Sequence, residues 1–120
     1  MSAMIWQLPC MSQEFHEGPK IRQDVGDQLA IAYDFERSTG AYDWEEMVFT
    51  GVVGFRFTAS RYCSVDQVEA YDKLEMIAGS GWSAEIVDAP PGLTHYRIFF
   101  DDIGSYEVLA TGFVPPPEPT

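Results

Sequence analysis

Two stretches in the first half of the chain alternate apolar and polar residues, and a period of two predicts β-strands. In residues 29–36 the apolar positions are Leu29, Ile31, Tyr33 and Phe35. The second run, residues 46–58, also keeps one face apolar, but Gly51 and Gly54 interrupt it. Glycine inside a strand indicates a bend, a bulge or a close approach to the backbone. We expect the two runs to form a hairpin with a long connecting loop.

A second hairpin is predicted near the C-terminus. One face of its two strands carries Tyr96, Ile98, Phe100, Tyr106, Val108 and Ala110. The opposite face carries His95, Arg97, Ser105, Glu107, Leu109 and Thr111. Between the strands, residues 101–104 have the composition of a four-residue turn, with Gly104 suited to a left-handed closing position.

Helical signals are short. Ser64 and Gln67 have the spacing of a capping box, which predicts a helical turn after Cys63. A strand is expected across residues 71–77, and Ser80 is a candidate cap for a short helix over residues 81–88. Together these elements predict an α+β domain: a mostly antiparallel, curved β-sheet with one or two short helices.

The length of 120 residues suits one domain. Residues 1–114 are expected to form it, with residues 9–27 as an irregular connection because proline and glycine recur among polar residues there. Residues 115–120 contain four prolines and are expected to form a Pro-rich, disordered tail.

Charge narrows the classes of partner. Seven Lys and Arg face nineteen Asp and Glu, which gives a net charge of −12. This balance argues against nucleic acid and against an anionic membrane surface as partners. The sequence shows neither a membrane-spanning apolar run nor the features of a signal peptide, and it has two cysteines. A cytoplasmic protein of undetermined oligomeric state is the expectation.

Catalytic and metal-binding patterns are weak. His16, His95, Cys10 and Cys63 have no metal-ligand spacing, so we expect no metal and no cofactor. Cys63 and His95 would need to meet in space to form a nucleophile and its base, and the sequence does not bring them together. Glycine-rich phosphate loops are absent as well. We therefore expect a protein that is not an enzyme.

Aromatic and acidic residues are concentrated between the first two predicted strands. The candidate partner-binding residues are Tyr42, Asp43, Trp44, Glu45 and Glu46. Binding residues concentrate on loops, and Trp and Tyr are favoured interface anchors. Asp101 and Asp102 would form a second patch if the two turns lie at the same edge. Alternatively, Trp44 folds beneath the loop as part of the core, and the two aspartates serve only their turn.

Two segments carry a resemblance. Residues 51–58, followed by Tyr62-Cys63-Ser64 and by residues 69–72, resemble a pattern in small, acidic, uncharacterised bacterial proteins, and so do residues 95–110. The chain is also similar in size and charge to immunity proteins of bacterial toxin systems, which are single acidic domains that bind and block a toxin. Neither resemblance implies catalytic residues.

These observations favour a non-enzymatic binding or inhibitor protein of the immunity type, which binds a basic toxin or nuclease through an acidic face with aromatic anchors. One alternative is a small-molecule-binding or enzymatic domain with a pocket enclosed by the curved sheet. Another alternative is a phage anti-defence protein that mimics DNA with its acids.

Overall fold

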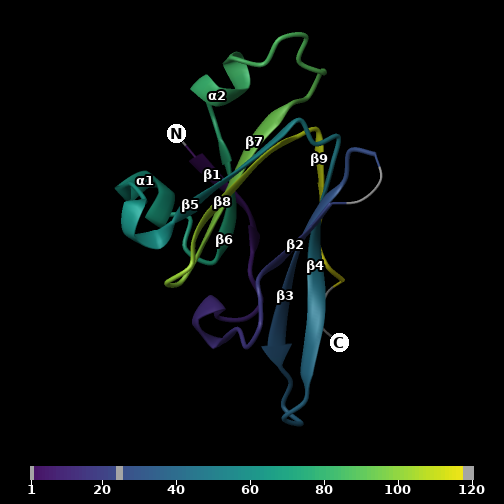
Figure 1. The fold of residues 1–120 in the computed structure, drawn as a ribbon, viewed down its shortest axis with the longest axis vertical. Helices are drawn as coiled ribbons and strands as arrows, with labels where there is room; N and C mark the ends of the chain where they lie inside the picture. The colour runs from purple at the N-terminus through teal and green to yellow at the C-terminus, as the bar shows by residue number, and fades with distance from the viewer. Residues whose placement is uncertain (1, 24–25, 118–120) are drawn as a thin grey trace.

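The computed structural model describes residues 2–23 and 26–117, which form two antiparallel β-sheets packed face to face (Figure 1). The larger sheet has the order β1-β6-β7-β8-β5 and the smaller β2-β3-β4-β9. The strands are β1 Ser2–Gln7, β2 Lys20–Gln23, β3 Leu29–Glu36, β4 Tyr42–Thr50, β5 Gly54–Ala59, β6 Lys73–Ile77, β7 Thr94–Phe100, β8 Gly104–Ala110 and β9 Gly112–Val114. The helical segments are η1 Ser12–Glu14, η2 Ser60–Tyr62, α1 Val65–Val68 and α2 Gly81–Ala84. The predicted α+β class is confirmed, with two sheets in place of one.

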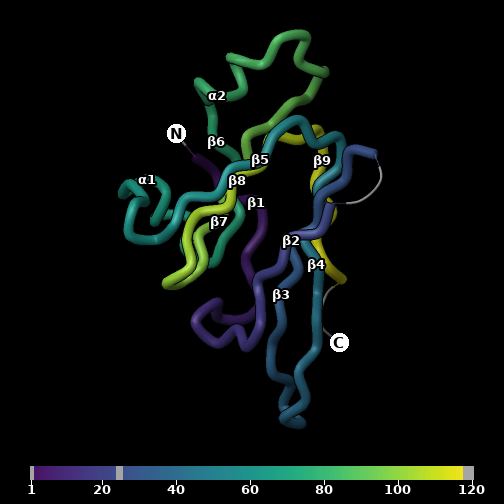
Figure 2. Tube along the Cα trace, in the orientation of Figure 1, coloured from purple at the N-terminus to yellow at the C-terminus, as the bar shows by residue number. Residues whose placement is uncertain are grey.

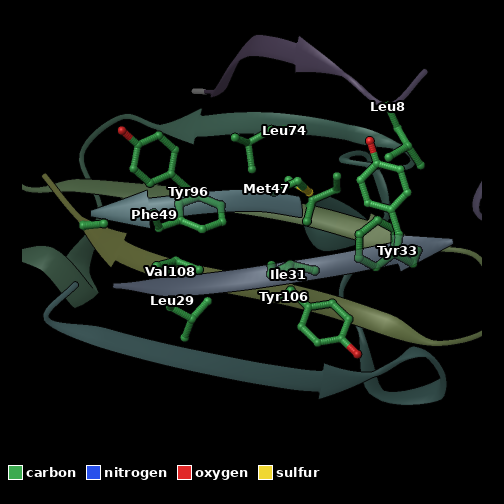
Figure 3. Close-up of a cluster of buried hydrophobic side chains, with 13 residues drawn as sticks. Leu8, Leu29, Ile31, Tyr33, Met47, Phe49, Leu74, Tyr96, Tyr106 and Val108 are labelled. Atoms are coloured by element: carbon green, nitrogen blue, oxygen red, sulfur yellow. The ribbon is translucent and has the colours of Figure 1, made fainter. Parts of the chain in front are cut away.

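The hydrophobic core lies between the two sheets. Figure 3 shows Ile31 and Met47 near its middle, with Phe49 and Tyr96 toward one end and Tyr33 toward the other. All but Tyr96 are fully buried, and Tyr96 is only 6% exposed. The apolar positions of the alternating pattern therefore face inward, as the sequence predicts.

The hairpin of β3 and β4 is longer than predicted. The two strands pair continuously from Leu29 with Phe49 to Glu36 with Tyr42, so the connection is only residues 37–41. Residues 42–46 were expected in a loop, and that expectation is wrong because they are the first half of β4. The hairpin projects as a two-stranded arm beyond the rest of the molecule (Figure 2).

The run over residues 46–58 is also not one strand. It divides at Gly51, so that β4 stays in the smaller sheet and β5 joins the larger one, where it pairs with β8. Gly51 has a φ of 62°, and a Cβ atom there would collide with the side chain of Thr111. A left-handed backbone and a close neighbour both require glycine at this crossing point.

The hairpin of β7 and β8 is confirmed, with Tyr96 opposite Val108 and Phe100 opposite Gly104. Its turn differs in one detail. Asp102, with a φ of 58°, takes the left-handed conformation that was assigned to Gly104. Gly104 has a φ of 145°, and a Cβ atom there would collide with the carbonyl oxygen of Thr58. Position 104 therefore requires glycine, because β5 passes too close to its backbone to leave room for a side chain.

Both short helices cover the outer face of the larger sheet, opposite the core. α1 begins with the predicted capping box of Ser64 and Gln67. α2 begins at the predicted cap, Ser80, but is shorter than residues 81–88. The indole of Trp82 in α2 lies over Gly54, where a Cβ atom would stand 3.0 Å from the ring. The molecule thus has three layers: short helices, the five-stranded sheet and the four-stranded sheet.

The irregular connection predicted for residues 9–27 is only partly irregular, because it contains η1 and the strand β2. The backbone N–H groups of His16, Glu17 and Gly18 all donate to the buried carboxylate of Asp34, which fixes this segment on β3. Residues 115–117 of the predicted tail have no regular secondary structure, and residues 118–120 lie outside the described part. Within the described residues, none of the helices has the length and apolar character required to span a bilayer.

Candidate functional site

The predicted partner-binding residues lie along β4 on the projecting hairpin. Side chains alternate along a strand, so Tyr42 and Trp44 share the outer face of the smaller sheet, away from the core. Their side chains are 46% and 41% exposed. The alternative in which Trp44 folds into the core is therefore wrong.

The acids of this segment are mostly engaged within the chain. Asp43 forms an ion pair with Arg37, and Glu46 forms a bidentate pair with Arg22, whose closest contact is 2.8 Å. The ammonium group of Lys20 lies 5.1 Å from the ring of Trp44, within cation–π distance. Local acidity is therefore smaller than the sequence suggests, and the exposed rings are the main feature of this surface.

The edge of β4 is only partly covered. β9 pairs with Val48–Thr50. Within residues 2–23 and 26–117, no strand pairs with residues 42–47 of β4 on that side. The chain continues as residues 115–117, all prolines, which have no N–H group to donate to a neighbouring strand. They help to line a groove of about 310 Å³ with Trp44, Val48 and Val114.

Asp101 and Asp102 occupy the turn between β7 and β8, in the other sheet. The hydroxyl of Tyr71 donates to the carboxylate of Asp101 at 2.9 Å, and the backbone N–H of Asp101 donates to Ser12. Figure 1 shows this turn well apart from the tip of the β3–β4 hairpin. The condition for a shared acidic patch is not met, and Asp101 has a local structural role.

A polar cluster that the sequence analysis missed is built around Glu107, on the outer face of the larger sheet. Oε1 of Glu107 accepts hydrogen bonds from Nε2 of His95 at 2.7 Å and from Nε of Arg97 at 3.1 Å. Oε2 accepts from Nε2 of Gln67 in α1 at 3.1 Å, and Nη2 of Arg56 lies 3.5 Å from Oε1. These donors come from β7, α1 and β5, so the carboxylate joins three elements.

The charge of Glu107 is stabilised by this environment. Burial alone would raise its pKa, because Glu107 is only 1% exposed. The hydrogen bonds from His95 and Gln67 and the positive charges of Arg97 and Arg56 outweigh burial and lower the pKa to about 2. Glu107 is therefore ionised at neutral pH.

Ser80, His95 and Glu107 form a continuous line of hydrogen bonds. Oγ of Ser80 lies 2.7 Å from Nδ1 of His95, while Nε2 faces the carboxylate. Nε2 donates to the ionised carboxylate, and the tautomer of the imidazole decides whether Ser80 or Nδ1 donates in the other hydrogen bond. A serine–histidine–acid line can activate a nucleophile. In this cluster the carboxylate is not reserved for the histidine, because Arg97 and Gln67 also donate to it.

Arg56 is the exposed member of the cluster. Its guanidinium carbon lies 4.0 Å from the centroid of the Trp82 ring, and its side chain is 49% exposed. Arg56 and Arg97 both line a cavity of about 380 Å³ between α2 and the sheet, together with Ser80, Trp82, Glu85 and His95. The cluster is therefore accessible from solvent through Arg56, while Glu107 stays beneath it.

Other candidate groups do not assemble into a site. Sγ of Cys63 lies 3.4 Å from the carbonyl oxygen of Thr58, and the ring of His95 is engaged by Ser80 and Glu107. Burial, followed by the nearby acids, raises the pKa of the Cys10 thiol to about 12. Within the described part of the chain, no three His, Cys, Asp or Glu residues are placed to hold a metal ion.

Comparisons with known proteins add no relative: no family model, no curated protein and no solved structure matches this chain. The fold defines the class of protein: an α+β domain built from two antiparallel sheets. Two features of its surface bear on function: the β4 strand and the Glu107 cluster.

Proposed function

We propose that this chain is a binding protein of the inhibitor type, which docks an extended, basic segment of a partner protein along β4. The observation that carries the proposal is the pair of exposed rings, Tyr42 and Trp44, on a strand that has no β-strand partner on this edge between residues 42 and 47 in the described part of the chain; there only the prolines 115–117 lie beside it.

An open strand edge offers backbone N–H and C=O groups to a further strand, and exposed side chains beside it provide specificity. Tyr42 and Trp44 bring large apolar surfaces with polar groups at their ends, as interface anchors do. The groove beside Trp44 would take a side chain of the added segment.

The partner's charge follows from the whole molecule. Since Asp43 and Glu46 are paired internally, attraction arises mainly from the net charge of −12. Such a field speeds the approach of a basic protein, and the aromatic contacts then hold it in place. The similarity in size and charge to immunity proteins supports a toxin or nuclease as the class of partner.

The test is a comparison of three immobilised proteins exposed to native bacterial lysate: the wild type, Trp44→Ala and the control Tyr62→Ala. Tyr62 is 70% exposed and follows β5, outside the β4 surface. We expect one basic protein to bind the wild type and Tyr62→Ala. Loss of an interface anchor commonly costs at least about 2 kcal/mol, so Trp44→Ala should lower the affinity by about 30-fold.

Hydrogen exchange on the purified complex then locates the interface. Amides along β4 should exchange more slowly in the complex than in the free protein. Equal capture by Trp44→Ala and wild type, slower exchange confined to the larger sheet, or no captured protein would each count against the proposal.

A further inference from the structure

We propose that the cavity between α2 and the five-stranded sheet binds a small organic anion, a carboxylate or phosphate carried on a body about the size of an aromatic ring. Arg56 is the residue that contacts the anionic group. This site shares no residue with the β4 surface, so it goes beyond the partner-binding function.

The first argument is the local charge. One row of the outer face has alternating signs, with Glu75 opposite Arg97, Arg97 opposite Glu107 and Glu107 opposite Arg56. Glu75 also has Lys73 at 3.8 Å. Along this row Lys73, Arg97 and Arg56 outnumber Glu75 and Glu107 by one. At the Arg56 end the two guanidinium groups share the carboxylate of Glu107, and Glu85 is the other acid beside them.

The second argument is the geometry of Arg56. Its guanidinium carbon lies 4.0 Å from the centroid of the Trp82 indole, a distance that suits stacking of the guanidinium on the ring. A stacked guanidinium keeps its N–H groups in its own plane, where two of them can bind one carboxylate or phosphate. Nη2 of Arg56 lies 3.5 Å from Oε1 of Glu107, which is long for a hydrogen bond, so the guanidinium keeps the capacity to donate to a ligand.

The third argument is the size and lining of the cavity. Its volume of about 380 Å³ lies within the range of small-molecule sites and exceeds what a bare inorganic ion needs. Trp82 and Ile77 supply apolar surface, and Ser80 supplies a hydroxyl group. Glu85 also lines the cavity and is the acid there that opposes an anion, although it is exposed to solvent.

The primary experiment uses the wild-type protein and two probes of equal shape, benzoate and benzamide, which differ in charge. Binding is followed by nuclear magnetic resonance through the backbone N–H of residues 79–82 and the indole N–H of Trp82. Because a hydrogen bond to a charged group is stronger than a neutral one, we expect benzoate to bind at least about tenfold more tightly than benzamide. Phenyl phosphate and inorganic phosphate, titrated alongside, separate a phosphate ligand from a carboxylate and show the contribution of the ring.

Three variants test the assigned residues. Arg56→Gln should abolish the preference for benzoate, whereas Glu85→Gln should increase the affinity for benzoate because it removes a negative charge from the lining. The matched control is Arg61→Gln: Arg61 also lies over an aromatic ring, that of Tyr62, but is not part of the Glu107 cluster. It should leave the affinity unchanged.

Several results would overturn the proposal. Benzoate and phenyl phosphate could bind no better than benzamide, or the shifted signals could lie away from residues 79–82. The affinities and the positions of the shifted signals are both measured on the wild-type protein, so the test holds even if Arg56→Gln fails to fold. Equal loss of benzoate binding in Arg61→Gln would show a nonspecific charge effect and would also reject the site. Since Trp44 and Tyr42 are untouched, none of these results bears on the β4 proposal.

Discussion

The ionised carboxylate of Glu107 ties β8 to β7, to β5 and to α1, and Glu107→Gln is the change that isolates its charge. Glutamine keeps the shape of the side chain. It places an amide where His95, Arg97, Arg56 and Gln67 all converge as donors, and it leaves two guanidinium groups with no counter-charge between them. We therefore expect the variant to fold but to be markedly less stable.

The size of the loss follows from the pKa. The structure lowers the pKa of Glu107 from 4.5 to about 2. Each unit of pKa is worth about 1.4 kcal/mol, so the charged form contributes about 3 kcal/mol to the free energy of unfolding at neutral pH. For a domain of this length, that loss lowers the melting temperature by roughly 10 °C.

The assay is urea unfolding of the wild type and Glu107→Gln, followed by circular dichroism at several pH values. A carboxylate with a lowered pKa stabilises the folded protein above its unfolded pKa, and that stabilisation is lost as the pH falls toward its folded pKa. The difference between the two proteins should thus be full above pH 4.5 and shrink steadily toward pH 2. The other acids titrate in both proteins and cancel in the difference.

A difference that stays the same between pH 7 and pH 3 would refute this reasoning, because the loss would then come from packing. Glu46→Gln is the matched control. Its carboxylate also accepts from an arginine, Arg22, but the side chain is 38% exposed. An exposed pair contributes about 1 kcal/mol or less, so this variant should lose little stability at any pH.

Three further outcomes are expected. Asp34→Ala should lower the free energy of unfolding by about 2 kcal/mol, because three N–H groups lose their buried acceptor. Hydrogen exchange at residues 16–18 should also become faster, and unchanged exchange there would contradict this prediction. Gly104→Ala should lower the melting temperature, measured by calorimetry, since its Cβ atom would collide with the carbonyl oxygen of Thr58, whereas an unchanged melting temperature would show that β5 can move aside. Cys10, with its pKa raised to about 12, should react with iodoacetamide at pH 8 far more slowly in the folded protein than in urea, as mass spectrometry would show; equal rates would mean that the thiol is not protected.

The sequence predicts the parts of this fold that depend on local periodicity. Alternation identified β3 and the hairpin of β7 and β8, and the serine caps identified both helices. Local periodicity did not predict the features that depend on contacts between segments far apart in the sequence. The division of residues 46–58 at Gly51 depends on Thr111, which is sixty residues away, and no local pattern reports that contact. Residues 42–45 do alternate aromatic and acidic side chains, which is itself typical of a strand. Tyr42 and Trp44 lie on the face opposite Met47 and Phe49, so the apolar positions change face between Trp44 and Met47 and the run looks interrupted in the sequence.

Part of the Glu107 cluster could have been predicted from the sequence. The alternating pattern had already placed His95, Arg97 and Glu107 on the polar face of one hairpin, and opposite charges directly across a hairpin favour one another. The turn over residues 101–104 fixes the register that pairs Arg97 with Glu107. Arg56, Gln67 and Ser80 could not have been added, because they reach the cluster from β5, α1 and α2 through the arrangement of the whole sheet.

The distribution of charge separates the two proposed surfaces. The sheets pack with their inner faces together, so the exposed rings of β4 and the cavity at Arg56 lie on opposite sides of the molecule. The negative net charge attracts a basic partner over long distances and repels an anion in the same way. A rise in ionic strength screens both effects, which weakens the long-range attraction of the partner and the long-range repulsion of the anion. Salt also weakens the direct contact of an anion with the half-exposed Arg56, so the comparison of benzoate with benzamide, and not the salt dependence, distinguishes binding at the two surfaces.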